Sequence, residues 1–226
     1  AFNNGGSDSI KNWNVGKVTS MAQMFQGQSN FNQEIGTWDV SKVTNMANMF
    51  WGGSIAPYGI FNNGGSDSIK NWNVSNVTNM NTMLTAQKNF NQPIGTWNTS
   101  KVTNMGYLFY AYVPGVSAFN QNISNWDTSK VTDMNQMFRN ADAFNQPIGN
   151  WNVSLVTTFN QFMGGKTDLN YSAANYDALL IGWASRPVQA NRSINFGTIK
   201  RTAASTAARA ILTSAPNNWT IVDGGI

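Results

Sequence analysis

Four aromatic residues in two loop-like segments are the first candidates for chemistry in this sequence. The segments are WGGSIAPYGI (51–60) and YAYVPGVSA (110–118), and their glycine and proline content is typical of surface loops. Exposed aromatic rings suit stacking on a sugar or on a partner protein. The competing interpretation is that the rings fold back and pack the loops onto the rest of the chain. The four candidates are Trp51, Tyr58, Tyr110 and Tyr112.

A second candidate surface consists of small polar residues that directly follow a recurring tryptophan. If the sequence folds into stacked repeats, these residues align in a row on what should be the concave face, where solenoids commonly bind ligands. Such a row could bind a polysaccharide or a protein. The alternative is a solvated face that is stabilised by ladders of side-chain amides. The residues are Asn14, Asp39, Asn73, Asn98, Asp127 and Asn152.

The phrase GGSDS occurs at 5–9 and at 64–68 and offers a weak calcium candidate. Asp8 and Asp67, together with Asn and backbone oxygens, could bind Ca²⁺ because this hard cation prefers oxygen ligands. The phrase lacks a second carboxylate, so a glycine-rich turn capped by Asp is the simpler interpretation. We therefore expect no metal or other cofactor.

The composition argues against an enzyme. The chain has no His and no Cys, so the commonest general base and thiol nucleophile are missing. Glu34 is the only glutamate. Asp39 and Asp127 belong to repeats two and five, and three layers place them about 14 Å apart. That separation exceeds the roughly 6.5–9.5 Å between the carboxylates of an inverting glycosidase.

Charge and hydropathy exclude two further classes of function. The net charge is +4, and the basic residues are scattered singly rather than clustered as phosphate binding requires. We therefore predict no nucleic-acid partner. Hydrophobic residues make up 41% of the chain, enough for a folded core, but no apolar run approaches the length of a membrane span. We expect no membrane insertion.

A repeat positions all of these residues. Six units read approximately F-N-x-x-I-x-x-W-[ND]-[VT]-S-x-V-T-x-M-x-x-M-F. The alternation in I-x-x-W-x-V predicts a short strand. The apolar spacing in V-x-x-M-x-x-M-F predicts a short helix, with the Ser or Thr before it as a cap. The base period is 25 residues, and the units are marked by Trp13, Trp38, Trp72, Trp97, Trp126 and Trp151.

A lone unit cannot bury its apolar side, but stacked units can. One layer of the expected core contains Phe31, Ile35, Trp38, Val40, Val43, Met46, Met49 and Phe50. The Asn after the repeated Phe should form a ladder that bonds backbone between neighbouring units. Its members are Asn32, Asn91, Asn120 and Asn145. Two insertions also recur, which defines a 59-residue super-repeat at 1–59 and 60–118. The two aromatic loops should therefore lie two layers apart, about 10 Å.

The repeats resemble those of the BspA-like leucine-rich-repeat surface proteins, which have a 25–26-residue bacterial surface repeat. The resemblance is carried by FNQPIGNWNVSLVT (144–157) and FNQPIGTWNTSKVTNM (90–105), and it covers about residues 1–165. The tail is also similar to the end of such arrays in marine bacteria and their phages. This resemblance implies a secreted or surface-displayed solenoid used in adhesion or recognition. The functional residues of that family are not defined by a motif, so none is transferred.

The pattern changes after residue 165. Two helices are predicted at 172–184, with Ser172 as N-cap, and at 202–214, and two short strands are predicted at SINFG and WTIVDGG. We expect residues 166–226 to form a C-terminal cap. The sequence starts within a repeat, so we expect either a piece of a longer chain or an end that another chain covers.

The predicted fold is α/β: a leucine-rich-repeat-like solenoid of about six strand–short-helix repeats, residues 1–165, with a small α/β cap, residues 166–226. The predicted function is non-enzymatic recognition or adhesion, with a cell-surface glycan or protein as partner, outside the cell or on its surface. The alternative is a structural module of a virion, such as a phage tail, fibre or decoration piece, or of an extracellular filament. That module would assemble through its uncapped N-terminal end and would lie on a virion surface.

Overall fold

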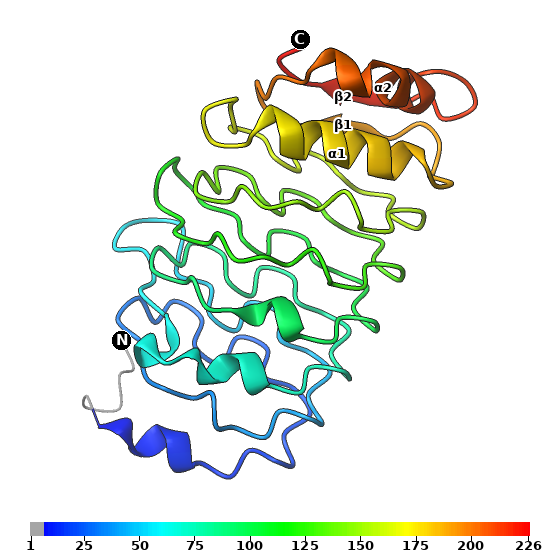
Figure 1. The fold of residues 1–226 in the computed structure, drawn as a ribbon. Coiled ribbons are helices and arrows are strands. Elements are labelled where there is room, and N and C mark those ends of the chain that lie inside the picture. Colours follow the sequence, from blue (N-terminus) through cyan, green and yellow to red (C-terminus); the bar gives the residue numbers. More distant parts are fainter. Residues whose placement is uncertain (1–6) are drawn as a thin grey trace.

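The computed structural model describes residues 7–226 and shows one coil of chain per repeat, stacked from the N-terminal end to the C-terminal helices (Figure 1). We number the coils one to six by their tryptophans, from Trp13 to Trp151. A parallel ladder of single bridges joins the coils at the variable residue of V-T-x-M. The ladder consists of Ser20, Asn45, Asn79, Asn104, Asp133 and Thr158. Each coil is thereby hydrogen-bonded to the next along one side of the stack.

The M-x-x-M-F segment is a run of turns, so the prediction of a short helix is wrong. In every coil, the residue before the second apolar position has a φ between 52° and 63°, in the left-handed region. An α-helix cannot pass through that conformation. The affected residues are Gln23, Asn48, Thr82, Tyr107, Gln136 and Gln161. An apolar residue at every third position therefore marks three-residue turns here, which bury the same side chains as a helix would.

Alternate amides of this segment bond to the next coil instead of to their own. The amides of Met46, Asn48 and Phe50 donate to carbonyls of coil three over 2.9–3.0 Å. The Thr before the bridge adds a side-chain bond, since Thr78 Oγ1 donates to the carbonyl of Thr44 in the preceding coil over 3.1 Å. The expected helix-capping role of this Thr is therefore replaced by a bond between coils.

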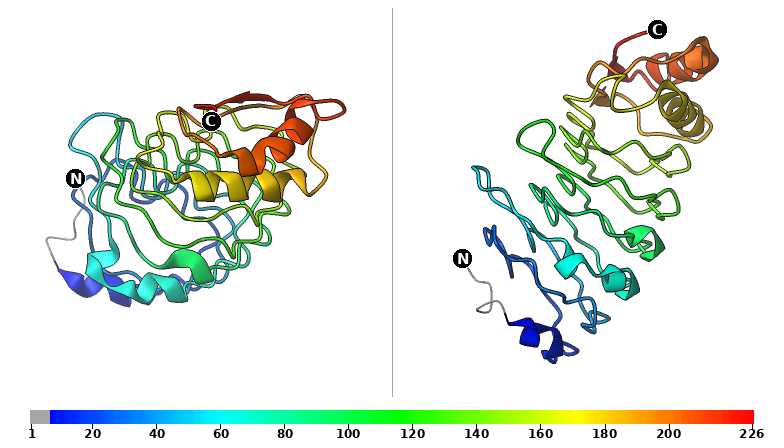
Figure 2. Two further views of the ribbon diagram at one scale, coloured as in Figure 1. Left: turned by 45° about the horizontal axis from the view of Figure 1, so that its top comes forward. Right: turned by 60° about the vertical axis from the view of Figure 1, so that its left-hand side comes forward.

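The I-x-x-W segment is a tight turn, so the prediction of a strand there is also wrong. In all six coils the Trp amide donates to the carbonyl of the Ile three residues earlier, over 3.1–3.2 Å. Some coils extend this turn into a 3₁₀ helix, and these helices lie above one another along one edge of the stack (Figure 2). They are η2 (Asp8–Asn12), η4 (Asp67–Asn71) and η5 (Ile94–Thr96), with η3 (Asn63–Gly65) before η4.

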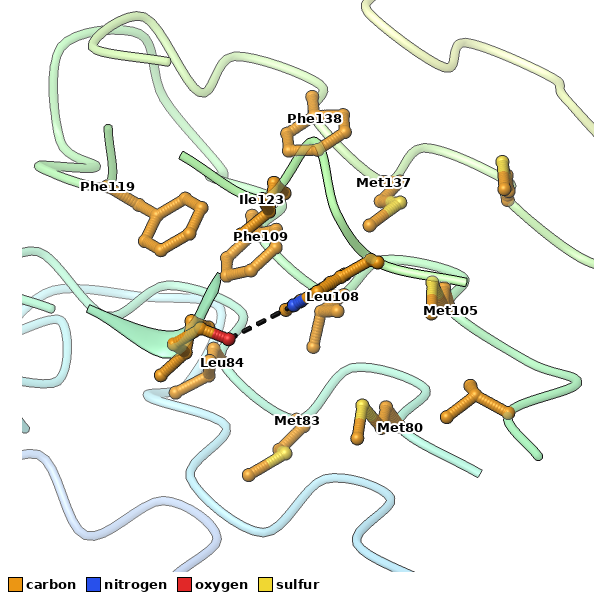
Figure 3. Close-up of a cluster of buried hydrophobic side chains, with 14 of the residues drawn as sticks. Met80, Met83, Leu84, Met105, Leu108, Phe109, Phe119, Ile123, Met137 and Phe138 are labelled. Carbon is orange, nitrogen blue, oxygen red and sulfur yellow. Dashed lines mark hydrogen bonds between the residues drawn. The ribbon is translucent and has the colours of Figure 1, made fainter. Parts of the chain in front are cut away.

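The core lies inside the coils, and its predicted layer is confirmed. All eight side chains of the layer from Phe31 to Phe50 are at most 3% exposed. Figure 3 shows the same arrangement in the middle of the stack, where Met80 and Met83 of coil three pack beside Met105 and Leu108 of coil four. Each repeat therefore contributes one apolar layer, and no repeat has a core of its own.

A tryptophan is required in each coil because its indole makes a polar bond as well as an apolar contact. Trp126 Nε1 donates to the carbonyl of Ile94 in the preceding coil over 3.0 Å. The same bond links Trp97 to Ile69 over 3.0 Å and Trp151 to Ile123 over 3.1 Å. Each indole thus adds a second hydrogen bond to a buried Ile carbonyl that already accepts the backbone amide of the Trp in its own coil. Leucine is smaller than tryptophan and could not donate this bond.

The predicted asparagine ladder is confirmed. Asn91 Oδ1 accepts the amide of Asn120 over 2.9 Å, and Asn120 Oδ1 accepts the amide of Asn145 over 2.9 Å. Asn62 is a further member, because it links Asn32 to Asn91 through bonds of 2.7 and 3.1 Å. The ladder ties each coil to the next beside the buried Phe column.

The coils are spread farther apart at the Phe column than at the bridge ladder. Phe31, Phe61, Phe90 and Phe119 have ring centroids 5.8–6.0 Å from one to the next. Hydrogen-bonded parallel backbones lie about 4.8 Å apart. The spacing is also wide at the Trp column, where the rings that stack lie 6.1–6.4 Å apart, so the residues that flank the tryptophans lie on a more widely spaced side than the bridge ladder.

The C-terminal residues contain the two helices and two strands that the sequence predicts. Helix α1 (Ala173–Ala184) begins at the predicted N-cap, because Ser172 Oγ accepts the amide of Asn175 over 3.3 Å. The second helical segment starts as the 3₁₀ helix η6 (Ala203–Ser205) and continues as α2 (Thr206–Thr213). Strands β1 (Ser193–Asn195) and β2 (Thr220–Val222) pair in parallel, and β1 also bridges to Phe159 of coil six.

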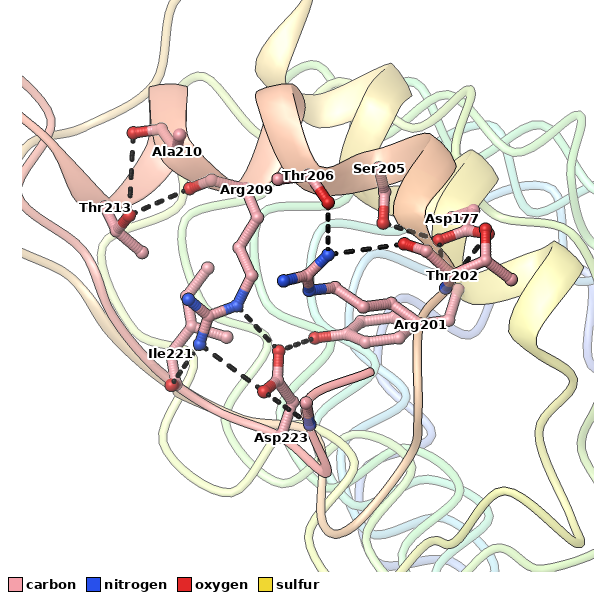
Figure 4. A network of polar contacts seen from close by, with 12 residues as sticks. Asp177, Arg201, Thr202, Ser205, Thr206, Arg209, Ala210, Thr213, Ile221 and Asp223 are labelled. Atoms are coloured by element: carbon pink, nitrogen blue, oxygen red, sulfur yellow. Dashed lines mark hydrogen bonds and ion pairs between the residues drawn. The ribbon is translucent and has the colours of Figure 1, made fainter.

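Two carboxylates hold these elements together (Figure 4). Asp177 on α1 accepts the amide and hydroxyl of Thr202 over 3.1 and 2.6 Å, and it also accepts the hydroxyl of Ser205. Asp223, just after β2, pairs with Arg209 Nε over 2.9 Å and accepts the hydroxyl of Tyr176 over 2.8 Å. None of the helices within residues 7–226 has the length and apolar character needed to cross a bilayer.

A buried lysine joins coil five to the start of the C-terminal region. The Lys166 side chain is fully buried, and its Nζ donates to the carbonyl of Ala141 over 2.7 Å. Loss of hydration lowers the pKa of Lys166 to about 7, and the negative charge of Asp142 only partly opposes this effect.

We predict that Trp126→Phe costs about 1–3 kcal/mol of unfolding free energy, since it removes the indole's hydrogen bond to the buried Ile94 carbonyl and puts a smaller ring in the core. That carbonyl keeps its bond from the Trp97 amide. Trp126→Ala should cost more, about 3–5 kcal/mol, because it also opens a cavity. Urea unfolding followed by circular dichroism measures both values. A neutral Trp126→Phe would show that the indole bond adds nothing to the stack.

We predict that the free energy of unfolding rises with pH between about 7 and 10, because an unfolded Lys166 binds a proton in this range and a folded one does not. The slope from this one group should reach at most about 1.4 kcal/mol per pH unit. Lys166→Met should abolish that part of the rise. Parallel stability curves for the two chains over this range would contradict the prediction.

Candidate functional site

Two positions of the turn segment form parallel columns along one side of the stack; most of their residues are half-buried, and Thr85 is buried. The first is the left-handed residue, and the second lies three residues farther along. Because equivalent positions align from coil to coil, the residues in each column are neighbours although they are far apart in sequence. In coils two to five the first column is Asn48, Thr82, Tyr107 and Gln136, and the second is Trp51, Thr85, Tyr110 and Arg139.

An open pocket of about 380 Å³ interrupts these columns at coil three. Thr82 and Thr85 of that coil are small, whereas Trp51 of coil two and Tyr107 and Tyr110 of coil four have large aromatic side chains. Two layers of parallel backbone separate coils two and four by about 10 Å. The volume falls in the range of small-molecule sites, about 300–1,000 Å³. The lining residues are Asn48, Trp51, Asn81, Thr82, Thr85, Tyr107, Tyr110, Tyr112 and Gln136.

Tyr107 is fixed as one wall of the pocket. Its hydroxyl accepts bonds from Asn135 Nδ2 over 2.8 Å and from Gln136 Nε2 over 3.0 Å. Its carbonyl accepts the hydroxyl of Thr85, and its amide donates to the carbonyl of Asn135 over 2.7 Å. Backbone and side chain are therefore both held, so the ring is oriented before any ligand arrives.

Tyr112 connects the two aromatic loops across the pocket. Trp51 Nε1 donates to the Tyr112 hydroxyl over 3.2 Å, which joins coil two to the loop after coil four. That loop is itself fastened to coil five, because Asn140 Nδ2 donates to the carbonyl of Ala111 over 2.9 Å. The amide of Gly115 also donates to Asp142 Oδ2 over 2.8 Å. The structure thus brings Trp51 and Tyr112 into contact, whereas the super-repeat predicted only that the two loops lie about 10 Å apart.

Tyr110 stands among other rings and beside a cation. Its ring meets Tyr112 edge-on at a centroid distance of 4.8 Å, and the Arg139 guanidinium lies 5.8 Å from its centroid. Burial raises the pKa of Tyr110, Arg139 opposes that shift, and Tyr112, Tyr107 and Tyr58 add to it. Tyr58 is half-buried near this group but is not among the lining residues. All four predicted loop aromatics are half-buried, so both interpretations of the loops hold in part: the rings pack on the stack and still expose part of their surface.

The polar residues that follow each tryptophan do not meet at the pocket. Each accepts a hydrogen bond from the backbone amide two residues later, over 2.9–3.3 Å, which forms a local turn. Hydrogen bonds from Ser41 lower the pKa of Asp39, and those from Ser129 lower the pKa of Asp127. These bonds favour the structural interpretation of the row formed by Asn14, Asp39, Asn73, Asn98, Asp127 and Asn152.

The two weak calcium candidates, Asp8 and Asp67, each form an ion pair with a lysine, which favours the simpler interpretation of these segments as turns. Asp8 pairs with Lys11 and Asp67 pairs with Lys70, each over 2.5 Å, so a lysine ammonium group balances the charge of each carboxylate. The turns are capped by serine rather than by aspartate, because Ser66 Oγ accepts the amide of Ser68. Within residues 7–226 no cluster of three acidic side chains could hold a metal ion. The glycines at positions 5 and 6 of the first GGSDS phrase lie outside the described residues.

Sequence reasoning missed most of the pocket. The V-x-x-M-x-x-M-F spacing predicts a helix through Thr82 and Tyr107, and it assigns no role to Thr85, which follows the motif. The signal that could have found them is a change in side-chain size from repeat to repeat at positions that are neither Met nor Phe. The missed lining residues are Asn48, Asn81, Thr82, Thr85, Tyr107 and Gln136.

Comparison with protein-family models gives a match. The model described as Mycoplasma protein of unknown function, DUF285, matches residues 1–63 and 57–176. The chain belongs to this family. The two matches together span residues 1–176, which includes all six coils and the start of α1. Comparison with curated proteins and with solved structures gives no match.

Proposed function

We propose that this chain is a surface-displayed recognition module that binds a cell-surface glycan or protein through the pocket at coil three. The observation that carries this proposal is the pocket itself, an aromatic-lined hollow that departs from an otherwise regular stack. Concave sites with several aromatic walls and a few polar groups are typical of ligand binding. A leucine-rich-repeat-like solenoid, as the sequence resemblance implies, would serve as a rigid support for such a site.

Family membership is consistent with this role. The DUF285 family group includes BspA-like repeat proteins, and the sequence resembles the surface repeats of those proteins. We propose on this ground that the module acts outside the cell, in adhesion. The pocket residues are amides, hydroxyls and aromatic rings, which suit binding better than acid–base chemistry, and we propose that the module is not an enzyme.

The test fills the pocket with a side chain that the fold already tolerates. Thr82→Tyr copies Tyr107, which occupies the equivalent position of the next coil at nearly the same φ, 58° against 60°. We predict that this variant unfolds at the same urea concentration as the parent chain and loses binding in a screen of whole cells and polysaccharides. Binding is measured by flow cytometry with labelled protein.

The matched control is Gln161→Tyr, which places the same side chain at the equivalent position of coil six, outside the pocket. It should bind like the parent chain. A Thr82→Tyr variant that is folded and binds as well as the control would contradict a recognition role for this pocket.

The second candidate is a structural module of a virion or filament that assembles through its N-terminal end. This function predicts that the mass measured by light scattering rises with protein concentration and is unaffected by Thr82→Tyr. A chain that stays monomeric at high concentration would contradict assembly by these residues alone.

A further inference from the structure

We infer that the pocket at coil three receives one pyranose ring of an uncharged glycan. This inference rests on the proposed recognition function and selects a glycan over a protein as its ligand. It follows from three properties of the described pocket: its walls, its unused hydrogen-bonding groups and its lack of charge.

The walls form a slot for one ring. Trp51 lines the pocket from coil two, and Tyr107 and Tyr110 line it from coil four, with Thr82 and Thr85 of coil three between them. The two backbones are about 10 Å apart, which leaves space for one ring after the aromatic side chains are counted. The C–H faces of a pyranose pack on aromatic rings, as other apolar groups do.

The groups that line the slot differ in whether their hydrogen bonds are already used. Thr85 and Gln136 bond to Tyr107, and the hydroxyl of Thr82 donates to Asn81 Oδ1 over 2.8 Å. By contrast, among the described contacts the side-chain amide of Asn48 and the hydroxyl of Tyr110 make no hydrogen bond. These two groups lie on opposite sides of coil three. A ligand with hydroxyl groups around its rim would satisfy both, whereas a purely apolar ligand would leave them unpaired.

The pocket offers no partner for a charged ligand. None of its described lining residues is acidic or basic. Arg139, which contacts two lining residues, is already engaged, since it lies against the Tyr110 ring and donates to Gln136 Oε1 over 2.9 Å. Moving a carboxylate or sulfate into this site would remove its hydration without giving it an ion pair. The observations therefore favour a neutral sugar over an acidic one and over a charged peptide segment.

The first experiment separates the glycan from the protein ligand on cells that bind the parent chain. Cells are treated either with periodate, which cleaves the vicinal diols of sugars, or with a protease, and labelled chain is then added. We expect periodate to abolish binding and protease to leave it. Competition with a soluble glucan, mannan or galactan should reduce binding, whereas a polyuronate should not.

The second experiment removes one hydroxyl group from the wall of the pocket. Tyr110→Phe keeps the ring but removes the free hydroxyl, and we expect about a tenfold weaker affinity for the competing polysaccharide in titration calorimetry, as the loss of one hydrogen bond predicts. Tyr171→Phe is the matched control, because its hydroxyl is buried away from the pocket and donates to the carbonyl of Gln146. It should leave the affinity unchanged.

The outcomes distinguish this inference from the proposed function. Binding that is lost after protease and retained after periodate, but still abolished by Thr82→Tyr, would overturn the glycan while leaving the recognition site in place. Competition only by the polyuronate would overturn the neutral ligand. If the chain binds to no cell type, or if Thr82→Tyr leaves binding unchanged, both the glycan inference and the proposed recognition function are overturned.

Discussion

The rest of the structure depends on alternate backbone amides leaving their own coil to bond with the next one. In coil two, the amides of Met46, Asn48 and Phe50 all donate to coil three. Such bonds require the chain to turn every three residues through a left-handed position, and this position recurs in all six coils. An α-helix would consume the same amides internally and would leave the coils joined only by apolar contact. The sideways bonds therefore fix the register, and the core layers follow from it.

Polar side chains add hydrogen bonds between coils to those that the backbone makes. The indole of Trp126 reaches the carbonyl of Ile94, and the Asn91 carboxamide reaches the amide of Asn120. Both bonds join one coil to its neighbour, so they are repeated along the stack with little change. Because the scaffold is held by these buried or regular contacts, the side chains in the two turn-segment columns are free to differ. Small threonines in one coil between aromatic residues in its neighbours are enough to create a pocket.

The sequence predicted the parts of the fold that depend on burial. The apolar layer from Phe31 to Phe50, the asparagine ladder and the N-cap at Ser172 were all correctly expected, since each follows from residue type and spacing. The secondary structure of the repeat was not, because three-residue turns and a helix bury the same Met positions. An Asn at the left-handed position of coil two hints at this conformation, but Tyr107 at the same position does not. The pocket could not be foreseen while that position was thought to lie in a helix. The 59-residue super-repeat predicts that the two aromatic loops lie about 10 Å apart, but it does not predict the bond between Trp51 and Tyr112.

The central claim is that the regular stack holds two aromatic walls two coils apart and leaves a ring-sized space over coil three. A crystal structure of the chain soaked with the neutral oligosaccharide that competes best for binding would test this claim most directly. The account predicts one pyranose between Trp51 and Tyr107, over Thr82, with hydroxyls bonded to Asn48 and Tyr110. An oligosaccharide bound instead along the row from Asn73 to Asn152, with the pocket closed by Tyr112, would contradict it.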